Sequence, residues 1–141
     1  MTREKMIALL DRCRTAMANR DTSALIAAHG ENCVVESPTA GGMAKGREAA
    51  ARVYDAWFSA FPDLAVVGGD MLIDGNRAAH ILTLSGTHTG VFLGLPATGK
   101  PFKVPLLWLI EAENGLITHA RPFYDFSGVL IQIGLLKVKA M

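Results

Sequence analysis

Residues 119–128, HARPFYDFSG, carry groups that could do chemistry at a strict two-residue spacing. The stretch follows the turn-forming pair Asn114-Gly115 and is predicted to be a β-strand, in which side chains two apart share a face. The residues of this row are His119, Arg121, Phe123 and Asp125. A carboxylate at the mouth of an apolar cavity is poorly solvated, which raises its pKa and suits it to general acid and base catalysis. We therefore predict that Asp125 moves protons inside a pocket.

Each polar member of this row also has a structural interpretation. Asp125 precedes Phe-Ser-Gly and could instead cap a final helix at the surface. Pro122 interrupts the strand, and proline in a strand indicates an edge or a bulge that would turn His119 or Arg121 outward. Arg121 is explained equally well as a brace for a carboxylate and as a ligand contact. The residues alone leave these alternatives open.

Further candidates for the site are a histidine, a tyrosine and several aromatic side chains. His88, in SGTHTG, is the predicted partner of Asp125, by a hydrogen bond across neighbouring strands or by polarising a ligand carbonyl. A structural histidine is the alternative. Tyr54 could donate a hydrogen bond to a carbonyl, unless it points outward. A flat apolar ligand needs an aromatic surface. The candidates for it are Trp57, Phe61, Phe92, Trp108 and Phe123. The alternative is that these residues simply pack in the core.

Several other kinds of site are not supported by the sequence. His29 and His80 have no partners at metal-ligand spacing, so no metal is expected. GLPATGK fails the P-loop pattern because Pro follows its Lys, and no GxSxG nucleophile motif occurs. Cys13 and Cys33 lack a CxxC spacing and are expected to be reduced, packed thiols.

Composition predicts one globular domain spanning residues 1–141. Half of the 141 residues are hydrophobic and 19% are charged, which is typical of a chain with a real core. The net charge of +1 gives no electrostatic footprint for nucleic acid or an acidic membrane. The N-terminus, MTREKMIALLDRCRTAM, interleaves charged and apolar residues, unlike a signal peptide, and no apolar run approaches the ~18 residues of a membrane span. A cytoplasmic location is expected.

The chain is predicted to place helices before an antiparallel sheet. Helices are expected near residues 3–17 (capped by Thr2), 22–29 (capped by Asp21) and 46–60, with one short strand at 32–38 and a loop at 39–43. Hairpins are predicted around residues 74–76 and 114–115, with helix or coil from 127. This order indicates an α+β fold. The strands are apolar on both faces, so one face is expected to cover the helices and the other a second subunit, giving a homodimer.

Three stretches in this order and spacing, SGTHTGVFLGLPATGKPF, ENGLI and YDFSGVLIQIG, closely resemble the SnoaL-like polyketide cyclases. This family belongs to the nuclear transport factor 2-like, or ketosteroid isomerase-like, superfamily. NCVVESPTAGG and GREAAARVYDAWFSAFPDL match its first half, so the resemblance covers about residues 5–136. It implies a cone of curved antiparallel sheet around a deep pocket closed by helices.

The resemblance also implies a function. Characterised cyclases of the family close a ring by intramolecular aldol condensation without metal or organic cofactor, and their acid/base carboxylate carries over to Asp125. The predicted function is therefore cofactor-free acid/base chemistry on a small apolar carbonyl compound.

Three alternatives to this function stay open. In the related limonene epoxide hydrolases an Arg and a second Asp precede the LP.TG loop, whereas this chain has His88 and no second carboxylate. A ketosteroid isomerase would need an oxyanion hole, for which only Tyr54 and Asp125 are candidates. The third alternative is a non-catalytic binding module.

Overall fold

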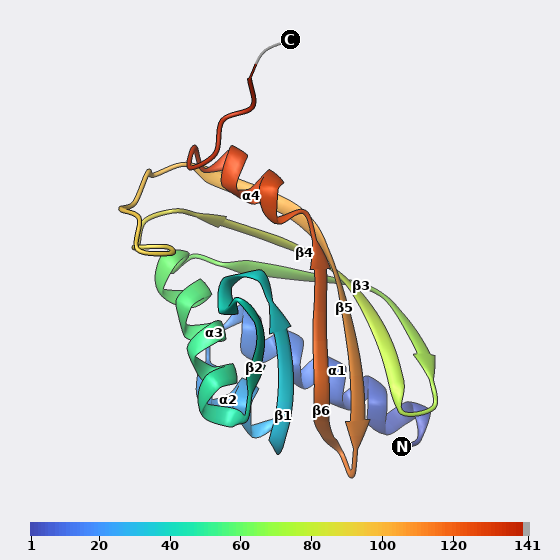
Figure 1. The fold of residues 1–141 in the computed structure, drawn as a ribbon. Coiled ribbons are helices and arrows are strands. Elements are labelled where there is room, and N and C mark those ends of the chain that lie inside the picture. The colour runs from blue at the N-terminus through green and yellow to red at the C-terminus, as the bar shows by residue number, and fades with distance from the viewer. Residues whose placement is uncertain (140–141) are drawn as a thin grey trace.

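The structure is a computed structural model that describes residues 1–139. The helices are α1 (Arg3–Ala18), α2 (Thr22–Ala27), a 3-10 turn (Pro38–Ala40), α3 (Arg47–Ala60) and α4 (Phe126–Gln132). The strands are β1 (His29–Ser37), β2 (Gly42–Lys45), β3 (Ala65–Asp74), β4 (Arg77–Thr87), β5 (Pro101–Glu113) and β6 (Leu116–Tyr124). The predicted α+β cone is confirmed (Figure 1).

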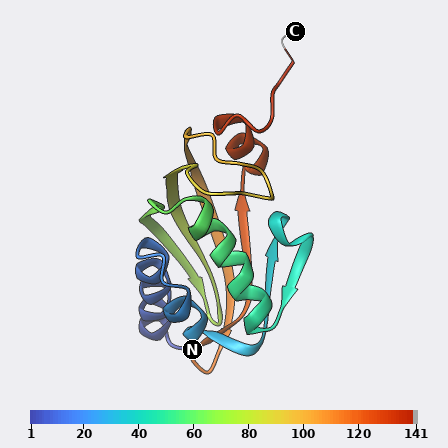
Figure 2. The same ribbon diagram turned by 90° about the vertical axis from the view of Figure 1, so that its left-hand side faces the viewer.

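One curved sheet of six strands forms the wall of the cone, in the order β2-β1-β6-β5-β4-β3. Neighbouring strands are antiparallel except β1 and β6, which are parallel. The β3–β4 register shifts between Gly68 and Met71, and such an irregularity bends a sheet. A side chain at Gly69 would lie 2.9 Å from the carbonyl oxygen of Ile81, so the strands approach closely there. Viewed from the helix side, α3 crosses in front of the sheet (Figure 2).

The core lies between the helices and one face of the sheet, which we call the inner face. Along β5 the even-numbered residues from Phe102 to Ala112 are buried, whereas their odd-numbered neighbours are more exposed. This alternation follows from the two-residue period of a strand. The apolar stripe of α1, including Met6, Leu10 and Cys13, is buried in the same core. Both cysteines are free and buried.

Local signals in the sequence predicted most elements correctly. The side chains of Thr2 and Asp21 cap α1 and α2 as expected. The predicted loop at residues 39–43 is wrong in part, because the chain turns at Gly41 and then pairs β2 with β1. Within residues 1–139, no helix has the length and apolar character needed to cross a membrane.

Candidate ligand-binding site

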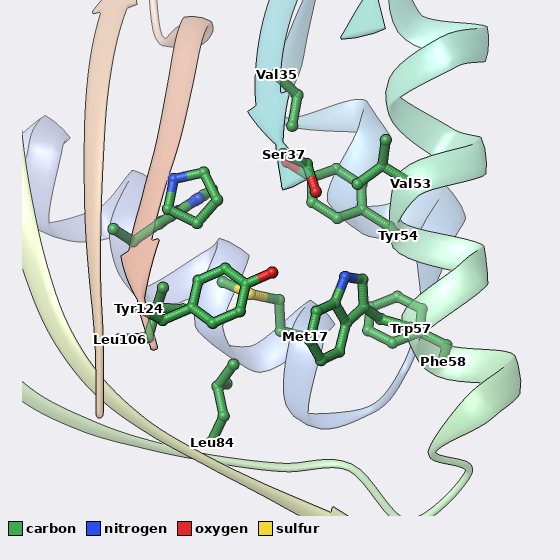
Figure 3. A pocket seen from close by; sticks show the side chains of 12 residues that line it. Met17, Val35, Ser37, Val53, Tyr54, Trp57, Phe58, Leu84, Leu106 and Tyr124 are labelled. Carbon is green, nitrogen blue, oxygen red and sulfur yellow. The ribbon is translucent and has the colours of Figure 1, made fainter. Parts of the chain in front are cut away.

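A cavity of about 80 Å³ lies under α3, against the inner face of the sheet. Its lining comes from five parts of the fold: α1, β1, α3, the β4–β5 pair and β6 (Figure 3). The lining residues are Met17, Val35, Ser37, Val53, Tyr54, Trp57, Phe58, Leu84, Leu106, Trp108, Pro122 and Tyr124. The walls are almost wholly apolar, and no lining residue is a carboxylate or an imidazole. Ligand pockets usually measure ~300–1,000 Å³, so a large ligand would need these side chains to move.

Tyr124, the last residue of β6, brings a hydroxyl group into the cavity. In Figure 3 this hydroxyl points away from β6 and towards α3, where Trp57 lies. The two rings meet edge to face with centroids 5.7 Å apart. The hydroxyl is buried and has no hydrogen-bond partner among residues 1–139, and burial raises its pKa, so it stays protonated. An unpaired buried hydroxyl is costly, and this one is free to donate a hydrogen bond.

Tyr54, on α3, is the second hydroxyl-bearing residue of the lining. Its oxygen lies 2.8 Å from Nε2 of His29. The other ring nitrogen of His29, Nδ1, lies 2.8 Å from the carbonyl oxygen of Leu25. His29 itself is fully buried. The histidine therefore anchors the tyrosine from behind the cavity wall.

The third polar side chain of the lining is Ser37, at the end of β1. Its hydroxyl accepts a hydrogen bond from the backbone N–H of Thr39 and lies 2.8 Å from the Thr39 hydroxyl. It is thus occupied within the turn that follows β1. Of these three hydroxyl groups, that of Tyr124 is the one without a partner in the described part of the chain.

Three of the predicted site residues line the cavity, namely Tyr54, Trp57 and Trp108. Phe61 and Phe92 are fully buried behind Trp57, with ring centroids 5.6 and 5.0 Å from its ring. They pack in the core, which was the structural alternative given for these aromatic residues.

Three other predicted residues share a face of β6, but it is the outer face of the sheet. His119 and Arg121 lie 3.1 and 3.5 Å from the same carboxylate oxygen of Glu36, and Phe123 is 53% exposed. Their expected place in the pocket is wrong, because β6 pairs Phe123 with Leu107, in the more exposed row of β5.

Asp125 lies outside the strand and outside the cavity lining. It is exposed and caps α4, and its Oδ1 accepts a hydrogen bond of 2.8 Å from the backbone N–H of Gly128. The expected pocket position of this carboxylate is therefore wrong. The strand ends at Tyr124, so Asp125 lies just beyond it. The two-residue spacing of a strand therefore does not place Asp125 on the same face as Phe123.

His88 is fully buried and makes hydrogen bonds that hold the loop between β4 and β5 in place. Its Nδ1 accepts from the backbone N–H of Thr98 at 3.2 Å and lies 3.0 Å from the Thr98 hydroxyl. Backbone bonds to Gly99 and Lys100 hold the same loop. The expected hydrogen bond from His88 to Asp125 is absent. Nδ1 of His88 contacts Thr98, its Nε2 has no partner among the described residues, and Asp125 pairs with Gly128.

Sequence reasoning missed Tyr124, the residue with the free hydroxyl. The signal in the sequence was that the even-numbered row Ala120, Pro122 and Tyr124 carries no charge, and the structure pairs this row with buried residues of β5. Within residues 1–139, no group of three or more histidine, cysteine or carboxylate side chains is arranged to hold a metal ion.

The chain is similar in sequence and in fold to known proteins. A segment of 53 residues is 38% identical to the aklanonic acid methyl ester cyclase DnrD of Streptomyces peucetius and covers 38% of this chain. That segment spans 37% of the relative's length. TsrD from Streptomyces laurentii is 26% identical, with a TM-score of 0.84 over 96% of this chain and 99% of that one.

A protein from Catenulispora acidiphila, solved in complex with trimethylamine, is similar in fold. It has a ketosteroid isomerase-like fold and matches with a TM-score of 0.78 at 20% identity, over 91% of this chain and 93% of that one. The sequence profile of the SnoaL-like polyketide cyclases matches residues 7–133. The chain therefore belongs to the SnoaL-like polyketide cyclase family.

Proposed function

We propose that the protein binds a small apolar carbonyl compound of the polyketide type in the cavity under α3. The observation that carries this proposal is the buried Tyr124 hydroxyl, which has no partner among the described residues and lies in a mostly apolar lining. A ligand carbonyl would accept its hydrogen bond, while the apolar walls would bury the carbon skeleton. The family membership and the likeness to the cyclase of S. peucetius support a ligand of this class.

We propose further that the bound compound undergoes ring closure by intramolecular aldol condensation, without metal or organic cofactor. A ligand that enters as its enol needs no carboxylate in the cavity. The enol carbon forms the new C–C bond, the attacked carbonyl becomes an alkoxide, and the enol proton passes to that alkoxide. Tyr124 would stabilise the negative charge on the attacked oxygen, as an oxyanion-hole donor does. Asp125 and His88 have structural roles in this proposal.

Binding can be tested through the two tryptophans of the chain, because both line the cavity. Fluorescence titration with butyrophenone should show saturable binding, and Tyr124→Phe should weaken it about 2- to 12-fold, the range of a net hydrogen bond. Butylbenzene, which has no carbonyl, is the matched control and should bind both proteins alike. An absence of butyrophenone binding, or equal affinity for Tyr124→Phe, would refute the proposal.

Ring closure can be tested separately with 2,6-heptanedione, which gives 3-methylcyclohex-2-enone by aldol addition followed by loss of water. The protein should accelerate product formation, and Tyr124→Phe should lower the rate. Binding without acceleration would favour a non-catalytic binding module. That second candidate is supported by the lack of a carboxylate or imidazole in the lining.

We also propose a homodimer through the outer face of the sheet. Large apolar side chains are exposed on this face along four neighbouring strands: Val67, Leu72, Ile81, Leu107 and Phe123. Exposed apolar surface of this kind is typical of an interaction site. Sedimentation at micromolar concentration should give twice the chain mass of 15.1 kDa, whereas a single-chain mass would contradict the dimer.

A further inference from the structure

We infer that the cavity selects a ligand that carries a hydroxyl group as well as a carbonyl, because Tyr54 presents an acceptor there and Tyr124 a donor. The inference rests on the proposed binding of a carbonyl compound and narrows its chemical class. It follows from the direction of the hydrogen bonds behind Tyr54.

The chain of hydrogen bonds from Leu25 to Tyr54 has one consistent direction. A carbonyl oxygen can only accept a hydrogen bond. Nδ1 of His29 must therefore carry a proton and donate a hydrogen bond to the carbonyl oxygen of Leu25, 2.8 Å away. In the neutral ring, Nε2 then has no proton and can only accept. The Tyr54 hydroxyl, 2.8 Å from Nε2, must therefore donate to it.

The surroundings of His29 keep its ring neutral. Burial lowers the pKa of His29 to about 4, and the positive charges of Arg47 and Arg12 add to this effect. The Arg47 guanidinium donates two hydrogen bonds, of 2.9 and 2.8 Å, to the backbone carbonyl of His29. At neutral pH the imidazole thus remains an acceptor, and the proton of Tyr54 stays directed away from the ligand.

The two tyrosines consequently make opposite demands on a ligand. The proton of Tyr54 is committed to His29, but its oxygen keeps lone pairs that can accept from a ligand O–H. Tyr54 comes from α3 and Tyr124 from β6, which face each other across the cavity (Figure 3). A ligand with an acceptor and a donor satisfies both, as an enolised 1,3-dicarbonyl or a phenolic ketone does.

Three ketones of nearly equal shape test this inference by calorimetric titration. They are acetophenone, 3-hydroxyacetophenone and 3-methoxyacetophenone, the last of which can only accept a hydrogen bond at the ring substituent. The wild-type protein should prefer the hydroxy over the methoxy compound about 2- to 12-fold. Tyr54→Phe should bring that ratio close to one, because the accepting oxygen is gone.

His29→Asn gives a readout that a purely structural role would not produce. The asparagine amide can replace Nδ1 as donor to Leu25 but is too short to reach Tyr54. The freed Tyr54 hydroxyl can then donate to the ligand as well as accept from it. The affinity for the methoxy compound should therefore rise, and the hydroxy-over-methoxy ratio should fall towards one. Circular dichroism should establish that both variants fold, and Tyr54→Phe decides the matter if His29→Asn does not.

The outcomes separate this inference from the proposed function. If acetophenone binds but the wild-type protein shows no hydroxy-over-methoxy preference, the inference fails and carbonyl binding stands. A preference that persists in Tyr54→Phe overturns it equally. If none of the three ketones binds the wild-type protein, the proposed function fails and the inference falls with it.

Discussion

Replacing His29 by asparagine should remove much of the acid sensitivity of folding between pH 6.5 and 4. His29 is fully buried, and its pKa falls from 6.5 to about 4, first because burial disfavours the charged ring and then because Arg47 and Arg12 repel it. The Leu25 carbonyl acts in the opposite direction, by favouring the protonated form. Tyr54 is the other group in hydrogen-bond contact with the ring.

The sign follows from proton linkage. Between pH 4 and 6.5 the unfolded chain binds a proton at His29 that the folded chain does not, so stability falls as the pH falls. The stabilisation by the neutral ring is complete above about pH 6.5 and is lost by about pH 4. Each pH unit of this interval is worth about 1.4 kcal/mol, so the drop from 6.5 to about 4 amounts to roughly 3 kcal/mol.

Urea unfolding of the wild-type protein and the variant at intervals from pH 7.5 to 4 measures this difference. His29→Asn should start less stable and lose roughly 3 kcal/mol less over the acid range than the wild-type protein. Tyr54→Phe is the matched control, because it removes the hydrogen bond to Nε2 but leaves the ring buried, and it should keep most of the wild-type slope. Equal slopes in the wild-type protein and His29→Asn would refute burial of a neutral imidazole.

Three further predictions concern other parts of the fold. Asp125→Ala should lower the free energy of unfolding by about 0.5–2 kcal/mol through loss of the α4 cap, whereas Asp125→Asn, which keeps an accepting oxygen, should cost less; loss of ketone binding in either would contradict a purely capping role. Gly90→Ala should destabilise the protein by about 1–3 kcal/mol or more in urea unfolding, because the added Cβ would overlap the carbonyl oxygen of Ser59. Gly30→Ala, whose Cβ would meet its nearest atom at 3.5 Å, should be milder, and equal losses would count against the steric account. Phe123→Lys places a charge on the exposed outer face and should shift sedimentation towards the monomer while circular dichroism stays native; a persistent dimer would place the interface elsewhere.

The elements that could be predicted from the sequence are those fixed by interactions within a few residues. Thr2 accepts from the N–H of Lys5, and Asp21 from that of Ala24. Asn114 and Gly115 both take the positive φ angles that a tight hairpin turn needs. Such features involve neighbours in the chain, so the residue types are sufficient evidence for them.

β2 could not be predicted in this way because nothing local specifies it. It is four residues long, begins at Gly42 and lies at the edge of the sheet, and glycine is a weak strand former. Its extended form depends on pairing with β1, which places Val34 opposite Lys45 and Ser37 opposite Gly42. The stabilising partner is thus a different segment, and the sequence of β2 alone does not indicate it.

The face of β6 that lines the cavity was also decided by partners from elsewhere in the chain. The spacing of His119 and Arg121 correctly placed them together, but parity cannot say which face is the inner one. Glu36 on β1 offers both side chains a partner at the partly exposed outer face, and burying these polar groups inside the cone without one would be costly. The uncharged row ending in Tyr124 therefore faces inward, and a phenol rather than a carboxylate becomes the polar group of β6 in the cavity. In a strand with one charged and one uncharged row, the uncharged row is thus the better place to look for the pocket.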